Sequence, residues 1–215
     1  MINNLFRLFL YLGSEWVIWV LAACSIFAVA VFFDRWRALR KQERIGNILW
    51  RDFLGKWLSD GLPSDWKKNA IELSRSHPCV ESRVLLALSR KEKTSPERLE
   101  ALSQGLISAE RLGLERYLAV LGTLGNSAPF IGLFGTVLGI IKAFAELDKA
   151  TGNSGLATVS GGLAEALVTT AAGLLVALPS AIAYNFFQRK TRAIASRTAS
   201  LASVVIGETA DTEGH

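Results

Sequence analysis

Hydrophobic residues in this chain gather in three long uncharged stretches rather than spreading evenly along it. The first stretch, residues 16–33, holds 18 residues without a charge. The second runs from residue 118 to 141, and the third covers residues 150–188 with Glu165 as its one charged side chain. A helix needs about 20 apolar residues to cross a bilayer. The pattern therefore predicts an all-α integral membrane protein with three transmembrane helices.

The polar stretches between these helices set the expected organisation. We expect an external N-terminus (1–15), transmembrane helices (16–33, 118–146 and 156–188), a cytoplasmic helical region (34–117), an external turn (147–155) and a cytoplasmic tail (189–215). Residues 35–116 hold 17 of the 24 Lys and Arg residues against 11 acids. Because cytoplasmic loops carry such an excess, the N-terminus is expected to be periplasmic and the C-terminus cytoplasmic. The basic segment fits contact with anionic membrane lipid better than binding of nucleic acid.

Apolar residues at helical spacing continue from the membrane segments into the cytoplasmic region. Stop signals predict helices near 36–58, 64–76 and 80–91. A capping pattern at Thr94 to Glu97 starts another helix, and no stop follows, so we expect one helix from about residue 96 to 145. The second and third membrane helices would thus extend into a cytoplasmic stalk. Five leucines are expected to pack the stalk against the first helix: Leu99, Leu102, Leu106, Leu114 and Leu118. The tail from Glu208 is expected to be disordered.

Glu165 is the principal candidate for ion chemistry. A carboxylate within an apolar span costs about 2.5 kcal/mol or more on insertion scales, and it usually faces a partner or a water path. If the last two membrane helices fold back near residues 150 and 151, Thr136 lies at the depth of Glu165. Lys142, near the turn, would have to reach about four helical turns to pair with the acid. We therefore expect Glu165 and Thr136 to form an ion pathway without a basic partner in the same chain.

Small residues surround these two positions. Stepping by three and four residues from Glu165 reaches Gly161, Gly162 and Thr169, and the same stepping from Thr136 reaches Gly132 and Gly139. Gly135 and Gly139 form a GxxxG pattern, which allows close approach of transmembrane helices. Both arms are therefore expected to pack tightly. Two prolines are expected to kink the helices: Pro129 and Pro179.

Other chemistry has little support. The chain lacks a Gly-Lys-Ser or Gly-Lys-Thr phosphate loop, so energy for any work is expected from the membrane gradient. Two histidines and two cysteines provide no metal-ligand spacing and no disulfide framework. No catalytic residues and no cofactor are expected. Leu21 to Cys24 is similar to a lipoprotein cleavage box, but the sequence stays apolar to Phe33, which favours a retained helix.

Two segments carry a family resemblance. APFIGLFGTVLGI at residues 128–140 and GGLAEALVTTAAGLLVALPSAIAYN at residues 161–185 resemble the MotA/TolQ/ExbB proton-channel family, within it the ExbB/TolQ branch. The resemblance implies a homopentameric ring around a central pore in the bacterial inner membrane. It also implies a single-span partner of the ExbD/TolR type that carries a membrane Asp, and an envelope-spanning effector. The motif acid corresponds to Glu165, the second-span threonine to Thr136 and the third-span threonine to Thr170.

The resemblance implies a stator subunit that converts the ion-motive force into mechanical work, for TonB-type import, Tol-type envelope maintenance or gliding. Two points stay open. Helical spacing places Thr169 in line with Glu165, whereas the family motif favours Thr170. The extra hydroxyl leaves sodium coupling open beside proton coupling. The alternative functions are a secondary transporter or passive channel for a small solute, and a membrane scaffold without ion chemistry.

Overall fold

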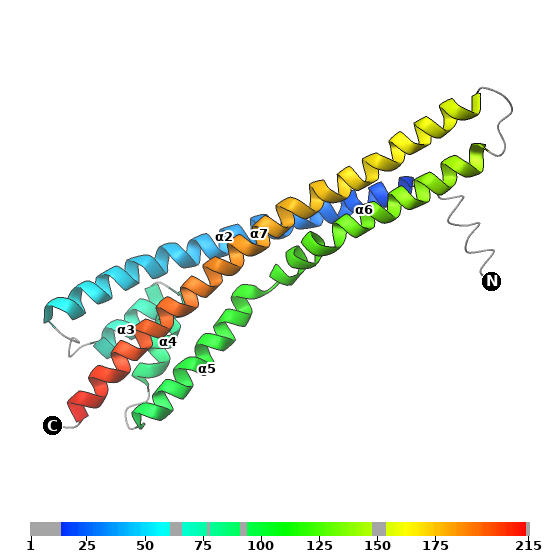
Figure 1. The fold of residues 1–215 in the computed structure, drawn as a ribbon. Helices are drawn as coiled ribbons and strands as arrows, with labels where there is room; N and C mark the ends of the chain where they lie inside the picture. The colour runs from blue at the N-terminus through cyan, green and yellow to red at the C-terminus, as the bar shows by residue number, and fades with distance from the viewer. Residues whose placement is uncertain (1–13, 61–65, 77, 91–93, 148–153, 214–215) are drawn as a thin grey trace. The chain divides into compact units, whose positions relative to one another are not determined.

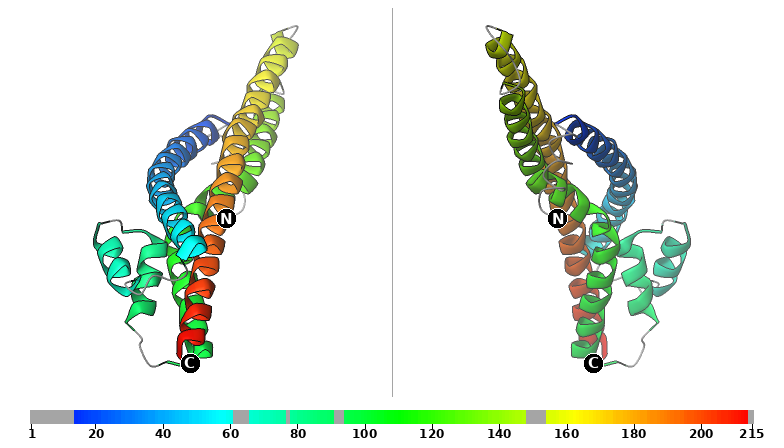
Figure 2. Two further views of the ribbon diagram at one scale, coloured as in Figure 1. Left: turned by 90° about the vertical axis from the view of Figure 1, so that its left-hand side faces the viewer. Right: turned by 90° about the vertical axis from the view of Figure 1, so that its right-hand side faces the viewer.

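The computed structural model describes residues 14–60, 66–76, 78–90, 94–147 and 154–213. These residues form helices and no strands (Figures 1 and 2). The helices are α2 (Glu15–Asp60), α3 (Trp66–Ser76), α4 (Val80–Ser89), α5 (Pro96–Glu115), α6 (Leu118–Leu147) and α7 (Ser154–Glu213). The predicted external N-terminus and external turn lie almost wholly outside the described residues.

Three of the described helices are long and apolar enough to cross a membrane. The candidate spans lie within Glu15–Arg51, Leu118–Leu147 and Val159–Ala210. They coincide with the three uncharged stretches of the sequence, so the predicted all-α fold with three membrane helices is confirmed at this level. Helix α2 continues through Cys24 without interruption.

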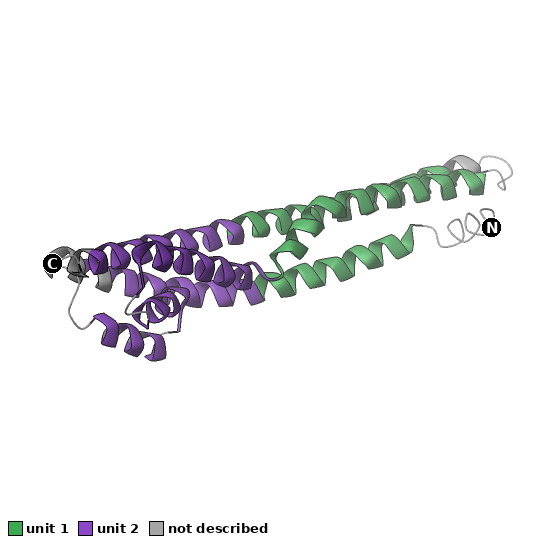
Figure 3. Ribbon diagram, turned by 90° about the horizontal axis from the view of Figure 1, so that it is seen from below, with its two compact units in different colours: residues 1–33, 117–186 green, residues 34–116, 187–215 purple. Residues whose placement is uncertain are grey.

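The chain divides into two compact units (Figure 3). Unit 1 comprises residues 1–33 and 117–186, and unit 2 comprises residues 34–116 and 187–215. Helices α2 and α7 contribute residues to both units, α6 belongs to unit 1, and α3, α4 and α5 belong to unit 2.

In unit 1, α6 and the first half of α7 lie side by side as an antiparallel hairpin (Figures 1 and 2). The start of α2 packs against this hairpin through Val17 and Leu21, which join Ala128, Val176 and Ala177 in one buried cluster. The ring of Trp16 meets Phe134 edge to face, with centroids 6.3 Å apart. Unit 1 is therefore a bundle of three membrane-length segments.

Unit 2 buries a stripe of α7 together with faces of the shorter helices. The stripe repeats every three or four residues, as expected for a helix with one buried face; its members are Phe187, Thr191, Ile194, Thr198, Leu201 and Val205. Helix α4 begins with a capping box, in which the Cys79 thiol accepts from the Ser82 amide at 3.4 Å and the Ser82 hydroxyl accepts from the Cys79 amide at 3.0 Å. The predicted helices of this region thus exist, with ends close to those expected.

The single helix expected from residue 96 to 145 is wrong. The chain breaks between α5 and α6, where Arg116 is extended (φ −52°, ψ 133°) and Tyr117 has φ 65°. This left-handed conformation is strained for a bulky residue. The sequence carries no Gly or Pro at this point, but the break coincides with the boundary between the two units. Packing within each unit, rather than local propensity, therefore ends α5.

Two further expectations about the cytoplasmic region are corrected. The face of α5 that is buried carries Leu99, Ser103 and Ile107, whereas Leu102 and Leu106 are exposed. A step of four residues keeps the first three side chains on one face, and α5 packs on α4. The tail from Glu208 is not irregular, because α7 remains helical to Glu213. The buried stripe of α7 extends to Ile206, which anchors this last stretch.

Candidate ion pathway

Glu165 lies on α7 and is exposed on the surface of the single chain. Its Oε1 atom accepts a hydrogen bond of 3.2 Å from the hydroxyl of Ser14, which lies just before α2 and is 2 % exposed. The carboxyl group is thus tied at one oxygen to a buried hydroxyl. The rest of its surface is open to whatever surrounds the chain.

The lysine of α6 does not neutralise this acid. Lys142 of α6 pairs with Glu15 of α2, with Nζ 3.7 Å from Oε1. Among the residues that the structure describes, no Lys or Arg forms an ion pair with Glu165. The expectation that this carboxyl lacks a basic partner in its own chain therefore agrees with the described part of the structure.

Thr136 is buried, but the structure does not place it opposite Glu165. Gly135 lies against Thr169, and Gly139 lies against Ala166. This register brings the residues after Gly139, rather than Thr136, to the level of Glu165, a difference of about one helical turn. The Thr136 hydroxyl donates to the carbonyl oxygen of Leu133 in its own helix at 2.7 Å. The expected match in depth is therefore wrong, because Gly139 rather than Thr136 lies against Ala166, the residue that follows Glu165.

The two neighbouring threonines of α7 have different surroundings. Thr169 is fully buried, and its hydroxyl lies 2.6 Å from the carbonyl oxygen of Ala166 and 3.3 Å from that of Gly132 across the hairpin. The hydroxyl oxygen of Thr170 is also shielded from solvent, but it has no hydrogen-bond partner in the described structure. Thr169 therefore packs the hairpin, whereas Thr170 retains an unused hydroxyl.

The predicted helix-packing glycines lie where the hairpin closes, with one exception. A Cβ atom would lie 2.7 Å from the Thr169 carbonyl oxygen at Gly132, 2.8 Å from the Thr169 hydroxyl at Gly135 and 2.6 Å from the Ala166 Cβ at Gly139. Real Cβ atoms do not approach so closely, so these positions require glycine. Gly162 packs in the same way against Ala143, at 2.8 Å.

Gly161 is the exception. It is exposed, and a Cβ atom there would meet no atom within 4 Å. Gly161 therefore makes no close contact within the described chain, and its predicted role in helix packing stays a prediction. Pro129 and Pro179 lie inside α6 and α7, and both helices continue through them; the predicted kinks stay predictions.

Ser14 was not identified from the sequence. It precedes the first apolar stretch, where a serine is unremarkable as a helix start, and nothing in its spacing relates it to α7. Its carbonyl oxygen accepts a hydrogen bond of 3.1 Å from the Val17 amide, and its hydroxyl donates to Glu165. Only the packing of α2 on the hairpin brings it to Glu165.

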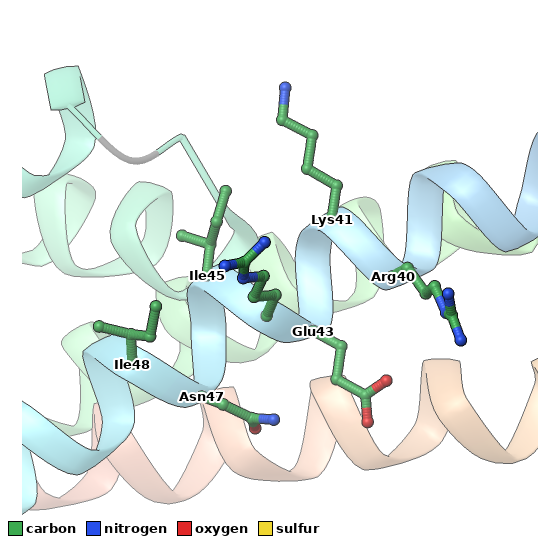
Figure 4. A pocket seen from close by; sticks show the side chains of 7 residues that line it. Arg40, Lys41, Glu43, Ile45, Asn47 and Ile48 are labelled. Atoms are coloured by element: carbon green, nitrogen blue, oxygen red, sulfur yellow. The ribbon is translucent and has the colours of Figure 1, made fainter.

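Unit 2 contains a second polar region, a groove of about 860 Å³ along α2 (Figure 4). Glu43 and Asn47 point towards α7, where Lys190 pairs with Glu43 at 2.5 Å and Arg197 donates to Asn47. Lys41 points away from that face. The Arg40 guanidinium lies 4.3 Å from the centre of the Trp36 ring. The predicted lipid contact of this basic segment stays a prediction.

Comparison with known proteins identifies the family. Residues 76–200 match the MotA/TolQ/ExbB proton channel family. This chain belongs to that family. A Tol-Pal system protein TolQ from Haemophilus influenzae is 32% identical over 189 residues, which cover 83% of this chain and 80% of the relative.

Two proteins named biopolymer transport protein ExbB are also similar. The Pseudomonas putida protein is 37% identical over 123 residues, which cover 57% of this chain and 37% of that protein. The Neisseria gonorrhoeae protein is 49% identical over 75 residues, covering 35% of this chain and 34% of that protein. The match to these two relatives thus spans little more than a third of their length. The predicted resemblance to the ExbB/TolQ branch is confirmed.

Proposed function

We propose that the protein is the proton-conducting stator subunit of an inner-membrane motor, which uses the ion-motive force to do mechanical work on a cell-envelope partner. The observation that carries this proposal is Glu165, an acid within an apolar span that is bound by a hydroxyl and not by a base. A carboxylate in this position is costly unless a proton neutralises it or a water path solvates it. Proton uptake and release at Glu165 would therefore change its preferred surroundings.

The exposure of Glu165 on the single chain supports a role for other chains. An ionisable group on the apolar surface of a membrane helix is expected to be covered by a partner helix or by a water-filled cavity. In this proposal, copies of the chain form a ring, a homopentamer as in the family expectation. A single-span helix with a membrane Asp of the ExbD/TolR type passes through the pore. The N-terminus is periplasmic and the C-terminus cytoplasmic.

The hydroxyls suggest which ion is carried. Thr169 is occupied with carbonyl oxygens of α6 and α7. Because it is also fully buried, a sodium ion could reach its oxygen atom only if the hairpin opened, which favours proton coupling. We assign two threonines to the ion pathway with Glu165: Thr170, whose hydroxyl has no described partner, and Thr136, which corresponds to the second-span threonine of the family motif. No bound cofactor is needed, since the transported proton carries the energy at about 2.3 kcal/mol for each charge that crosses 100 mV.

The test is complementation of a strain from which the gene is deleted. Glu165→Ala and Thr136→Ala are expected to abolish work driven by the ion-motive force while the oligomer still assembles. Two readouts distinguish the loads: import of a large ligand through the outer membrane for a TonB-type system, and resistance of the envelope to detergent for a Tol-type system. Full activity of both variants would contradict the proposal.

Proteoliposomes distinguish the remaining functions. The protein alone should pass no solute, whereas the protein with its single-span partner should dissipate a pH gradient in a manner that depends on Glu165. Solute flux through the protein alone would favour a secondary transporter or passive channel. A silent Glu165→Gln variant would favour a scaffold without ion chemistry.

A further inference from the structure

Ser14 occupies an unusual place at the start of α2. Its carbonyl oxygen accepts the amide of Val17, so the residue stands at the N-terminal end of this helix. Serines at this position usually turn the hydroxyl back to cap their own helix. Here the hydroxyl instead donates across to Glu165 at 3.2 Å. The side chain is 2 % exposed, so it is enclosed by protein on the other sides.

The turn of α2 that carries Ser14 packs against α6. A Cβ atom at Gly139 would lie 3.6 Å from the Ser14 Oγ atom, so the hydroxyl sits in ordinary contact distance of the close crossing of α6 and α7. The adjacent Glu15 pairs with Lys142 of α6, which fastens the same turn of α2 to the hairpin. The close passage of Gly139 and the Glu15–Lys142 pair therefore place the turn of α2 that carries Ser14 against α6.

We propose that Ser14 is a positioning residue for Glu165, holding the ionised carboxylate against the start of α2 until the carboxyl takes up a proton. This inference rests on the proposed function, since it assigns a step to the same carboxyl. A hydroxyl donates to a carboxylate without cancelling its charge. An arginine would instead lock the carboxylate in a permanent pair.

Charged side chains on the neighbouring helices also influence the protonation of Glu165. Among the described residues of the helices packed around it, α2 contributes Glu15 and α6 contributes Lys142, and these two are paired with each other. Their substitution is avoided in the test. Removal of the Ser14 hydroxyl then changes one interaction of Glu165 while the pair stays in place.

The experiment measures how fast a hydrophobic carbodiimide labels Glu165 in the full-length protein in liposomes, read by mass spectrometry at one fixed pH. The reagent reacts with the protonated carboxyl. Ser14→Ala removes the donor, and Ser14→Cys keeps the volume with a much weaker donor. Both variants should be labelled about threefold to tenfold faster than the wild type, the factor that corresponds to one ordinary hydrogen bond.

Ser180→Ala is the matched control. Ser180 of α7 is also 2 % exposed, but its hydroxyl donates to its own helix at the Val176 carbonyl oxygen, 2.7 Å away. This variant should be labelled at the wild-type rate. An unchanged rate in Ser14→Ala, or a wild-type rate in Ser14→Cys beside a raised rate in Ser14→Ala, would overturn the positioning role. Labelling needs no motor activity, so failure of the proposed function would appear separately, in complementation and flux.

Discussion

Two carboxylates, Glu81 in unit 2 and Glu165 in unit 1, have opposite surroundings. Glu81 of α4 is fully buried in unit 2, where Arg197 of α7 contacts its Oε1 atom through Nε at 2.9 Å and Nη2 at 2.5 Å. Gly46 of α2 leaves room for this pair, because a Cβ atom there would clash with both side chains. Glu165 of unit 1 is exposed, and among the described residues the Ser14 hydroxyl is its one hydrogen-bond partner.

The difference separates a structural acid from a candidate functional one. A buried carboxylate bound to a guanidinium has a fixed partner, and the pair connects the helices that carry it. An acid without a counter-charge is free to change its protonation at modest cost to the fold. The hairpin of unit 1 also packs closely through glycine contacts, as expected for helices that associate in a membrane. The predictions below test this contrast, from the largest effect to the smallest.

The first prediction exchanges the two acids for their neutral amides. Glu165→Gln cannot take up a proton, so proton flux with the partner should fall on the order of a hundredfold or more, with little change in thermal stability. Glu81→Gln should lower the stability of unit 2 by about 3 kcal/mol, since it leaves the partly buried Arg197 without its charge partner. Flux in proteoliposomes and thermal unfolding in detergent measure the two effects. A stability loss in Glu165→Gln that equals that of Glu81→Gln would remove the contrast.

A second prediction concerns the hairpin packing of unit 1. Gly139→Ala places a methyl group 2.6 Å from the Ala166 Cβ atom, so the helices must move apart, at a cost of about 1–3 kcal/mol. Gly161→Ala is the matched control, because its added methyl group meets no atom within 4 Å. Thermal unfolding of the two variants in detergent compares them. Equal stability would show that the close crossing is not what holds the hairpin.

A third prediction separates the neighbouring threonines. Thr169→Ala removes hydrogen bonds to carbonyl oxygens and should cost about 1–2 kcal/mol of stability. Thr170→Ala removes a hydroxyl that has no described partner, so stability should hardly change, while proton flux falls if Thr170 belongs to the pathway. The measurements are unfolding and flux on the same preparations. The reverse pattern would assign Thr169, not Thr170, to the ion.

The smallest predicted effect is a pH dependence in unit 2. Burial raises the pKa of the Cys79 thiol above its ordinary value of 9.0, and the carboxylate of Glu81 adds to this shift. The folded protein therefore keeps the thiol proton more tightly than the unfolded chain does. This stability is fully present at neutral pH and is lost as the pH rises through the raised pKa.

Cys79→Ser tests this dependence. A serine hydroxyl does not titrate in this range and can still cap α4. Between pH 7 and pH 10 the unfolding temperature of the wild type should fall slightly more than that of the variant. Parallel curves for the two proteins would show that the thiol contributes nothing to the pH dependence.

Several features of the protein could be predicted from the sequence alone. Uncharged stretches of sufficient length identified the three membrane helices. A charge is costly in the bilayer, so charged residues are rare in such helices. The same argument made Glu165 conspicuous. The GxxxG pattern of Gly135 and Gly139 identified the close crossing of the hairpin, and turn residues marked most helix ends of unit 2.

The tertiary structure decided the rest, for reasons of geometry. The facing pairs of the two helices differ from the expected ones by about four residues, a full turn, and this difference separates Thr136 from the level of Glu165. The burial of Thr169 and the contact of Ser14 with Glu165 follow from that register and from the packing of α2. The break at Tyr117 depends on packing within each unit. Contacts between residues far apart in the chain leave no periodic trace in its sequence, so only the folded structure reveals them.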